Sequence, residues 1–423
     1  MAIVLACAAN GADKVQVFNQ KAFKKFTDCP GRGIYHQAMQ NNAPALADIT
    51  DQIQQARASS SLLRIRGGGS KDFFGSALQG DTLDTRALQG IVSYEPSELV
   101  VTVHAGTPLA ELEAALREKK QCLPFEPPHF GQSPATVGGM VAAGLSGPSR
   151  ASVGATRDYV LGARFINGRG EHLTFGGQVM KNVAGYDVSR LLAGSWGTLG
   201  VITEVSLKVL SFAPSEATLV CTLAQAPALE LLQRWGGQPL PLNASCWLND
   251  TADGGETLFV RLRGAVAAVQ AAVPRMCADV AAIGGKADVM DNAQADPDWA
   301  AARDQRLPFF TAPPDADSCL WRLSVAQTTP ALDLPYATFI EWHGGQRWLW
   351  APATAASQLH ALAQRSGGHA TLFRRPAGAL ADAPAGGQVF TPLDAAQERI
   401  QSALQHQFDP DGVFNTRRIQ AGA

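Results

Sequence analysis

The stretch Arg64-Ile65-Arg66-Gly67-Gly68-Gly69-Ser70 constrains this chain most, because it puts three consecutive glycines where a short strand would end. Glycine reaches backbone angles that are closed to other residues, and it has no side chain to hold a ligand away. Consecutive backbone N–H groups in such a turn form a concave site for an anion. The stretch therefore predicts a phosphate cradle, and a tight structural turn is the alternative that explains the same three glycines.

Two further segments are rich in glycine and other small residues. The first spans residues 134–144 (PATVGGMVAAG), and the second spans 181–187 (KNVAGYD) together with 194–200 (GSWGTLG). A Rossmann site needs G-x-G-x-x-G, but Asp72 stands where the third glycine would be. A P-loop needs Ser or Thr after its lysine, but Ala287 follows Gly285-Lys286. Nicotinamide and nucleoside-triphosphate sites are therefore disfavoured.

In this order and spacing, the three segments resemble the FAD-binding domain of the vanillyl-alcohol oxidase and p-cresol methylhydroxylase flavoprotein superfamily. Within it, residues 63–75 (LRIRGGGSKDFFG), 180–192 (MKNVAGYDVSRLL) and 341–348 (EWHGGQRW) are most similar to the FAD-binding E subunits of glycolate oxidases. The resemblance implies an α+β fold. It comprises a two-part FAD-binding domain of the p-cresol methylhydroxylase type, a smaller α+β cap domain, and a C-terminal segment that returns to the FAD domain.

The same resemblance implies FAD as the cofactor. Its pyrophosphate would lie at the triple glycine, its ribityl chain and ring along residues 134–144, and its pyrimidine end near Gly200. The implied cofactor-binding residues are Arg66, Gly67, Gly68, Gly69, Ser70, Pro134, Thr136, Val137, Gly138, Gly139, Gly144, Gly200, Val201 and Ile202. Several members of the superfamily link the flavin to a histidine just after these glycines. This chain has Ser70 there and no cysteine nearby. The nearest alternatives are His104, which we expect to be structural, and His129, so we expect non-covalent FAD.

The resemblance also implies a heteromeric enzyme that oxidises glycolate, a 2-hydroxy acid, to glyoxylate. Its partners would be a larger paralogous flavin subunit and an iron–sulfur subunit that passes electrons towards a quinone pool. The location would be cytoplasmic, with a peripheral position at the inner membrane through the complex as an open alternative. Two other functions stay open: a self-sufficient FAD-dependent 2-hydroxy acid dehydrogenase, and a degenerate flavin-fold subunit that acts as a scaffold. The catalytic residues are unassigned.

Composition narrows the classes of partner. The formal net charge of −2 argues against nucleic acid or an anionic membrane, and no apolar run approaches the roughly 20 residues of a membrane-spanning helix. The seven cysteines are scattered without C-x-x-C, which predicts buried thiols and no local iron–sulfur motif. Beyond residue 215 there is no His-x-His, so we expect no metal site. The cluster at 341–348 predicts a strand pair with tryptophans, and a substrate or partner site is the alternative.

The length of 423 residues favours two domains. We divide the chain into an N-terminal extension (1–42), the FAD-binding domain (43–212), the cap domain (213–392) and the returning C-terminal segment (393–423). In the first half we expect helices near 44–59 and 107–120 and strands near 62–66, 91–94, 99–103, 159–166, 171–175 and 201–210. The last of these alternates apolar and polar residues, so we expect it to be half-buried. No internal repeat is visible.

Residues before Met39 show no hydrophobic periodicity, and the family resemblance begins only near residue 43. We expect a poorly ordered extension or a misplaced start, and a real N-terminal arm is equally open. Weakly packed termini tolerate removal because few buried contacts depend on them.

Overall fold

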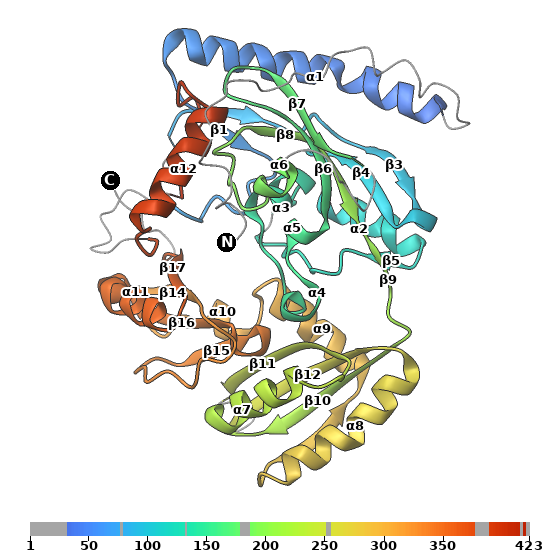
Figure 1. Cartoon of the computed structure of the whole chain (residues 1–423), viewed down its shortest axis with the longest axis vertical. Coiled ribbons are helices and arrows are strands. Elements are labelled where there is room, and N and C mark those ends of the chain that lie inside the picture. The colour runs from blue at the N-terminus through green and yellow to red at the C-terminus, as the bar shows by residue number, and fades with distance from the viewer. Residues whose placement is uncertain are drawn as a thin grey trace.

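The structure is a computed structural model that describes residues 32–76, 79–131, 133–177, 187–250, 255–376, 389–414 and 418–419. Cys7, Cys29, the segment 181–186 and most of the predicted N-terminal extension lie outside these residues. Figure 1 shows two halves: an N-terminal half coloured blue to green and a second half coloured yellow to orange, with the C-terminal helix returning beside the first.

A five-stranded antiparallel sheet forms the centre of the N-terminal half. Its strands are, in spatial order, β3 (Ile91–Glu95), β4 (Val100–His104), β8 (Val201–Lys208), β6 (Val160–Ile166) and β7 (His172–Gly176). Two small sheets accompany it: the parallel pair β1 (Leu63–Arg66) and β2 (Asp81–Asp84), and the pair β5 (Gln121–Cys122) and β9 (Leu210–Ser211). The helices are α1 (Arg32–Ser59), α2 (Leu109–Glu118), α3 (Val137–Ala143), α4 (Arg150–Val153), α5 (Thr156–Tyr159) and α6 (Val188–Leu191), with the 3-10 turn η2 (Pro96–Glu98).

Two clusters of buried side chains hold this half together. Helices α2 and α3 pack on the five-stranded sheet, with Leu112, Met140 and Val205 in one apolar core. Helix α1 packs on the β1–β2 pair, where Ile53 and Leu83 share a second core. These clusters fix β1, and therefore the glycine-rich loop that follows it, against the main sheet.

The predicted strands of this half are confirmed, whereas three details of the prediction are wrong. Helix α1 begins at Arg32 instead of residue 44, with Pro44 inside it, because one proline removes only one helical hydrogen bond. Helix α2 begins at Leu109 instead of residue 107, and the Thr107 hydroxyl accepts a hydrogen bond from the Gly90 N–H at 2.9 Å.

Strand β8 is the third correction, because it is buried on both faces instead of one. The polar side chains of that face are flanked by side chains of the neighbouring strands β6 and β4. Glu204 lies 3.4 Å from Arg164, and Ser206 shares a hydrogen bond with Thr102 at 2.8 Å. The central position of β8 in the sheet accounts for this burial, and that position is not visible in the alternation of its residues.

An eight-stranded antiparallel sheet forms the second half. Its strands are, in spatial order, β13 (Lys286–Met290), β10 (Ser215–Thr222), β12 (Gly255–Gly264), β11 (Leu242–Asp250), β15 (Thr338–Glu341), β16 (Gln346–Pro352), β14 (Ser318–Ser324) and β17 (His369–Arg374). The helices are α7 (Gln225–Gly236), α8 (Val266–Ala281), α9 (Asn292–Arg303), α10 (Pro308–Thr311) and α11 (Ala356–Arg365), with the 3-10 turns η3 (Trp342–Gly344) and η4 (Ala353–Ala355).

The eight strands form two similar sets of four, a repeat that the sequence analysis missed. Numbered along the chain, β10 to β13 lie in the order 4-1-3-2, and β14 to β17 lie in the mirrored order 2-3-1-4. The sets join where β11 pairs antiparallel with β15. Helices α7, α8 and α11 cover one face of the sheet. The other face packs towards the N-terminal half, where Phe74 and Phe130 join its apolar cluster.

Polar contacts also join the two halves. Glu126 accepts hydrogen bonds from Arg261 at 2.6 Å and from Arg263 at 3.2 Å. Burial by itself raises the pKa of Glu126, but the two guanidinium groups outweigh it and the pKa is lowered. The Trp342 indole N–H donates to the Gly147 carbonyl at 2.9 Å. These contacts set the position of the second sheet over the N-terminal half.

The C-terminal segment returns to the N-terminal half, as predicted. After α12 (Ala395–Phe408), the Val413 carbonyl accepts a hydrogen bond from the Leu63 N–H at 2.7 Å, and Phe414 pairs parallel with Leu63. We keep the predicted domain limits as a proposal, since residue 212 falls between β9 and β10. Within the described part of the chain, no helix combines the length and apolar character needed to cross a bilayer.

This return depends on one buried carboxylate. Asp409 accepts hydrogen bonds from the N–H groups of Val413 and Phe414, both at 2.9 Å. Because Asp409→Ala leaves two buried donors unpaired, we expect a loss of about 2–4 kcal/mol of unfolding free energy. Thermal melting should then fall by about 5–15 °C, at about 2–4 °C per kcal/mol. Asp411→Ala is the matched control, because Asp411 makes only an exposed ion pair with Arg57. Equal melting temperatures for both variants would contradict this account.

Candidate functional site

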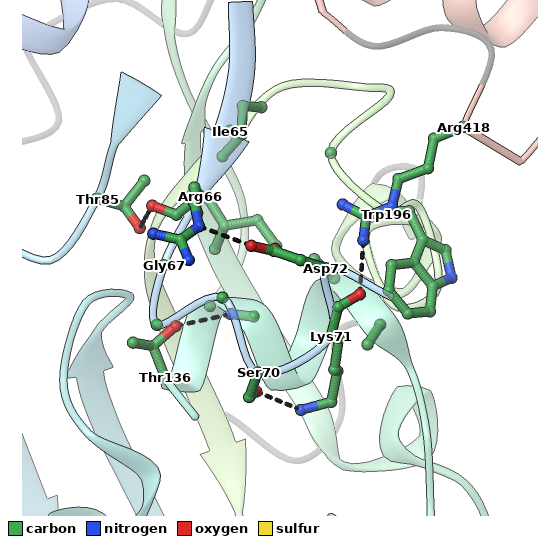
Figure 2. A pocket seen from close by; sticks show the side chains of 18 of the residues that line it. Ile65, Arg66, Gly67, Ser70, Lys71, Asp72, Thr85, Thr136, Trp196 and Arg418 are labelled. Atoms are coloured by element: carbon green, nitrogen blue, oxygen red, sulfur yellow. Dashed lines mark hydrogen bonds and ion pairs between the residues drawn. The ribbon is translucent and has the colours of Figure 1, made fainter. Parts of the chain in front are cut away.

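One cavity in the N-terminal half gathers the glycine-rich segments. It encloses about 670 Å³ of space, counting its open mouth. Figure 2 shows the side chains that line it, contributed by the loop after β1, helix α3, the turn before β8 and the C-terminal segment. The lining residues are Ile65, Arg66, Gly67, Gly68, Gly69, Ser70, Lys71, Asp72, Thr85, Thr136, Gly138, Gly139, Ala142, Ala143, Trp196, Gly197, Gly200, Ile202 and Arg418.

The loop after β1 is shaped by its own hydrogen bonds. The Arg66 carbonyl accepts from the Thr85 N–H at 3.0 Å, and the Gly69 carbonyl accepts from the Asp72 N–H at 3.1 Å. Gly69 has a φ of +76°, a conformation that favours glycine. The Arg66 guanidinium lies 2.8 Å from the Asp72 carboxylate across the loop. The loop thus has a defined shape in which the Arg66 side chain is held at the cavity wall.

Gly67 and Gly68 are required by a close contact with the second glycine-rich segment. A Cβ on Gly68 would lie 1.6 Å from the Pro134 carbonyl oxygen, and a Cβ on Gly67 would lie 2.3 Å from the Thr136 hydroxyl. The Thr136 hydroxyl caps α3 by accepting from the Gly139 N–H at 3.3 Å. The two segments therefore touch backbone to backbone, and no larger residue fits between them.

The third segment is attached to α3 from the other side. The N–H groups of Gly194 and Trp196 donate to the carbonyls of Val141 and Ala142, at 3.1 and 2.9 Å. The Trp196 ring stacks on Phe74 with 4.2 Å between ring centroids. These hydrogen bonds place Trp196 and Gly197 at the cavity wall opposite the triple glycine.

Lys71 is a cation that lines the cavity and that the sequence analysis did not select. Its side chain is 8% exposed, and Nζ donates to the Ser70 hydroxyl at 3.3 Å. Burial lowers the pKa of Lys71 to about 8, so the amine still carries its charge at neutral pH. The sequence did contain a signal for Lys71, because it directly follows Ser70 in the predicted phosphate-binding loop.

Arg418 is a second cation that the sequence analysis missed, and no motif could have indicated it. Its guanidinium donates to the Lys71 carbonyl at 2.8 Å and lies 4.8 Å from the Trp196 ring centroid. Burial lowers its pKa to about 10. Its Nε is buried and has no partner among the described residues. An unpaired buried cationic donor at a cavity wall favours an anionic ligand.

The structure brings most of the predicted site residues to this cavity. Arg66, Gly67, Gly68, Gly69, Ser70, Thr136, Gly138, Gly139, Gly200 and Ile202 line it. The other four do not: Pro134 contacts Gly68, Gly144 ends α3, and Val137 and Val201 point into the two apolar cores. Side-chain direction explains Val137 and Val201, because residues that face the core alternate with backbone that faces the cavity.

Other polar groups considered in the sequence lie elsewhere. His104 is buried and its pKa is lowered by burial, and His129 lies 3.0 Å from Glu113. Among the described residues, no three His, Cys, Asp or Glu side chains gather as a metal site would need. The cluster at 341–348 is confirmed as a strand pair, β15 and β16, joined by η3.

Comparison with known proteins agrees with this geometry. The family described as "FAD binding domain" matches residues 45–176. The glycolate oxidase subunit GlcE of Escherichia coli is 42% identical over 373 residues, which cover 88% of this chain and 97% of that protein. The glycolate oxidase subunit GlcD of Bacillus subtilis is 33% identical over only 31% of this chain and 27% of its own length. A solved structure of alkyldihydroxyacetonephosphate synthase superposes with a TM-score of 0.60 at 16% identity, covering 87% of this chain and 74% of that one, which supports the fold.

Gly139 allows a sharper test of this cavity than the triple glycine does. A Cβ on Gly139 would meet only the Thr136 hydroxyl, at 3.1 Å, so a side chain there would extend into the cavity. We expect Gly139→Asp to weaken FAD binding by about tenfold or more, through lost space and like-charge repulsion, while the fold survives. Flavin content and melting temperature measure the two effects.

Gly139→Ala is the control, because its methyl group meets only the Thr136 hydroxyl, which has to move by a few tenths of an ångström, and alanine favours the helix. If Gly139→Asp purifies with its full flavin content, α3 does not line the FAD site. Gly68 variants are unsuitable, since any Cβ there overlaps the Pro134 carbonyl whether or not FAD is bound.

Proposed function

The chain belongs to the flavoprotein family of the glycolate oxidase subunit GlcE, and we propose that it is the FAD-carrying subunit of a complex that oxidises glycolate to glyoxylate. The observation that carries this proposal is the cavity itself. Three glycine-rich segments, distant in sequence, line one cavity that also holds two buried cations, Lys71 and Arg418, and an unpartnered Nε on Arg418. Identity of 42% along 97% of the E. coli subunit supports the same function.

The residues at the cavity fit FAD. The N–H groups of the loop 66–70 would receive the pyrophosphate, and Lys71 and Arg418 would balance its charge. The unpartnered Nε of Arg418 supplies a donor that the protein itself does not satisfy. The small residues Gly139, Ala142 and Ala143 leave room for a flat ring system beside α3. FAD would supply the redox chemistry for a C–OH group, and the chain would supply binding, orientation and exclusion of water.

The turn before β8 would hold the far end of the cofactor. Gly200 has a φ of +146° and lies against the Ile166 carbonyl, where a Cβ would come within 2.5 Å. Its backbone therefore stays close to β6 while its open side lines the cavity. Gly200 and Ile202 would contact the pyrimidine end of the ring, as the family resemblance implies.

Electrons that leave the cofactor need a carrier outside the described residues. The described cysteines, Cys122, Cys221, Cys246, Cys277 and Cys319, are free, and burial raises the pKa of each, so none is poised as a thiolate ligand. We therefore infer partners: a larger flavin subunit related to GlcD, and an iron–sulfur subunit. The complex would be cytoplasmic, with peripheral attachment to the inner membrane through those partners.

We expect FAD to be bound non-covalently. Ser70 replaces the histidine of covalent relatives, and no His, Cys or Tyr is among the described residues that line the cavity. Acid precipitation of the purified chain should therefore release the yellow colour into the supernatant. Colour that stays with the pellet would reveal a covalent link and overturn this expectation.

We also expect the isolated chain to reduce artificial dyes with glycolate only weakly. Co-expression with a GlcD-like subunit and an iron–sulfur subunit should raise turnover by at least about tenfold, since electron transfer then has a path. The same complex prepared with Gly139→Asp measures how much of the turnover requires FAD bound to this chain. Robust turnover by the lone chain would favour a self-sufficient dehydrogenase. If the complex turns over at the same rate when this chain carries no FAD, the chain acts as a scaffold.

A further inference from the structure

A second cavity lies between the eight-stranded sheet and the N-terminal half. It encloses about 330 Å³ of space, counting its mouth. Strands β14, β15, β16 and β17 contribute side chains from the sheet face that packs towards the N-terminal half. Its lining includes Phe130, Arg322, Glu341, Gln346, Trp348 and Phe373.

Arg322 on β14 is an uncompensated cation in this cavity. No hydrogen bond or ion pair joins its guanidinium to another described residue, and its Nε is buried without a partner. The Phe373 ring lies beside it, with the ring centroid 5.6 Å from the guanidinium carbon. Burial lowers its pKa to about 10, so the side chain remains charged at neutral pH. A charge in such surroundings is costly unless a ligand of opposite charge pairs with it.

Glu341 is not that partner, because no hydrogen bond or ion pair joins it to Arg322 and its Oε2 is already engaged. Its Oε2 accepts from the Trp348 indole N–H at 2.6 Å and from the Gln346 amide N–H at 3.0 Å. Burial raises the pKa of Glu341 to about 7, which further reduces its charge. The hydrogen bond from Gln346 also fixes the orientation of its amide, with the NH₂ group towards Glu341.

Gln346 presents the complementary unpaired group. It is 2% exposed, and its Oε1 is buried without a partner among the described residues. In the β14–β16 register, Arg322 pairs with Trp348 and Ser324 pairs with Gln346, so Arg322 and Gln346 lie on neighbouring strands two positions apart. Arg322 Nε and Gln346 Oε1 are therefore an unpaired cationic donor and an unpaired neutral acceptor, among the described residues, on adjacent strands that both line the cavity.

This cavity adjoins the first one. Lys71, which lines the first cavity, donates to the Pro128 carbonyl at 3.4 Å and lies 5.5 Å from the centroid of the Phe130 ring. Pro128 and Phe130 both line the second cavity. Lys71 therefore contacts the walls of both cavities.

We propose that the second cavity binds a small 2-hydroxy carboxylate, with its carboxylate on Arg322 and its hydroxyl donating to Oε1 of Gln346; this assignment rests on the proposed function. A guanidinium takes a carboxylate through two parallel hydrogen bonds. A hydroxyl supplies the proton that the amide oxygen lacks, whereas a fully ionised phosphate or sulfate would face that oxygen with another acceptor. The aromatic walls, Phe130, Trp348 and Phe373, restrict the ligand to a short carbon chain.

The test is calorimetric titration of the FAD-loaded chain with glycolate and with acetate, which lacks the hydroxyl. Arg322→Gln should weaken glycolate binding by about tenfold or more, and Arg322→Lys should restore part of the affinity. Arg365→Gln is the control, since it removes the same charge from an exposed position at the end of α11 and should bind glycolate as the wild type does. Flavin absorbance and melting curves establish that each variant is folded.

Gln346→Leu tests the hydroxyl contact separately. We expect it to remove the preference for glycolate over acetate while acetate affinity stays within about threefold of wild type. Absence of glycolate binding to the wild type, or equal binding by Arg322→Gln, would overturn the proposal.

Turnover of the assembled complex separates this proposal from the proposed function. If glycolate binding depends on Arg322 but the complex does not oxidise glycolate, the binding site is supported and the proposed function is refuted. If the complex oxidises glycolate and its Arg322→Gln variant is equally active, the proposed function is supported and the binding site is refuted.

Discussion

The contact between Gly68 and Pro134 is the constraint on which the candidate FAD site depends. A Cβ on Gly68 would come within 1.6 Å of the Pro134 carbonyl oxygen, so the loop after β1 and the segment before α3 approach as closely as two backbones can. Helix α3 in turn holds the third segment, because its carbonyl groups accept hydrogen bonds from the N–H groups of Gly194 and Trp196. Because each segment is positioned by backbone contacts, the cavity keeps its shape without side chains that would compete with a ligand for space.

A second set of contacts decides where the eight-stranded sheet lies. Glu126 is held by Arg261 and Arg263, and the Trp342 indole reaches the Gly147 carbonyl. Gly147 itself lines the second cavity, so the contact that joins the halves also forms its wall. Removing one partner of a buried ion pair leaves an uncompensated charge, which makes this interface sensitive to single substitutions. The position of the second cavity beside the first follows from these few contacts.

Both cavities carry cationic side chains, but they differ in size and in the composition of their walls. This difference supports separate binding of the cofactor in one cavity and the substrate in the other. Lys71 and Arg418 stand at the first cavity, where the proposed cofactor brings a pyrophosphate. In the second cavity, which is smaller and has aromatic walls, Arg303 is paired with Asp304 and Arg322 has no ion-pair partner among the described residues. Lys71 separates the two, and its amine is charged below a pKa of about 8. The resulting field favours anions in both places, so cofactor and substrate would be attracted to adjoining sites by the same sign of charge.

Local sequence patterns were enough to identify the glycine-rich segments, the FAD-binding family and most strands of the first half, because these depend on runs of small residues and on alternation. They also selected ten of the residues that line the first cavity. The folded chain was needed to show that β8 is buried on both faces, that β10 to β17 form two mirrored sets, and that Arg418 reaches the cavity from the far end of the chain. The same holds for Arg322 and Gln346. A lone arginine or glutamine carries no local signal, and whether it lacks a partner depends on strands distant in sequence that meet only in the folded sheet.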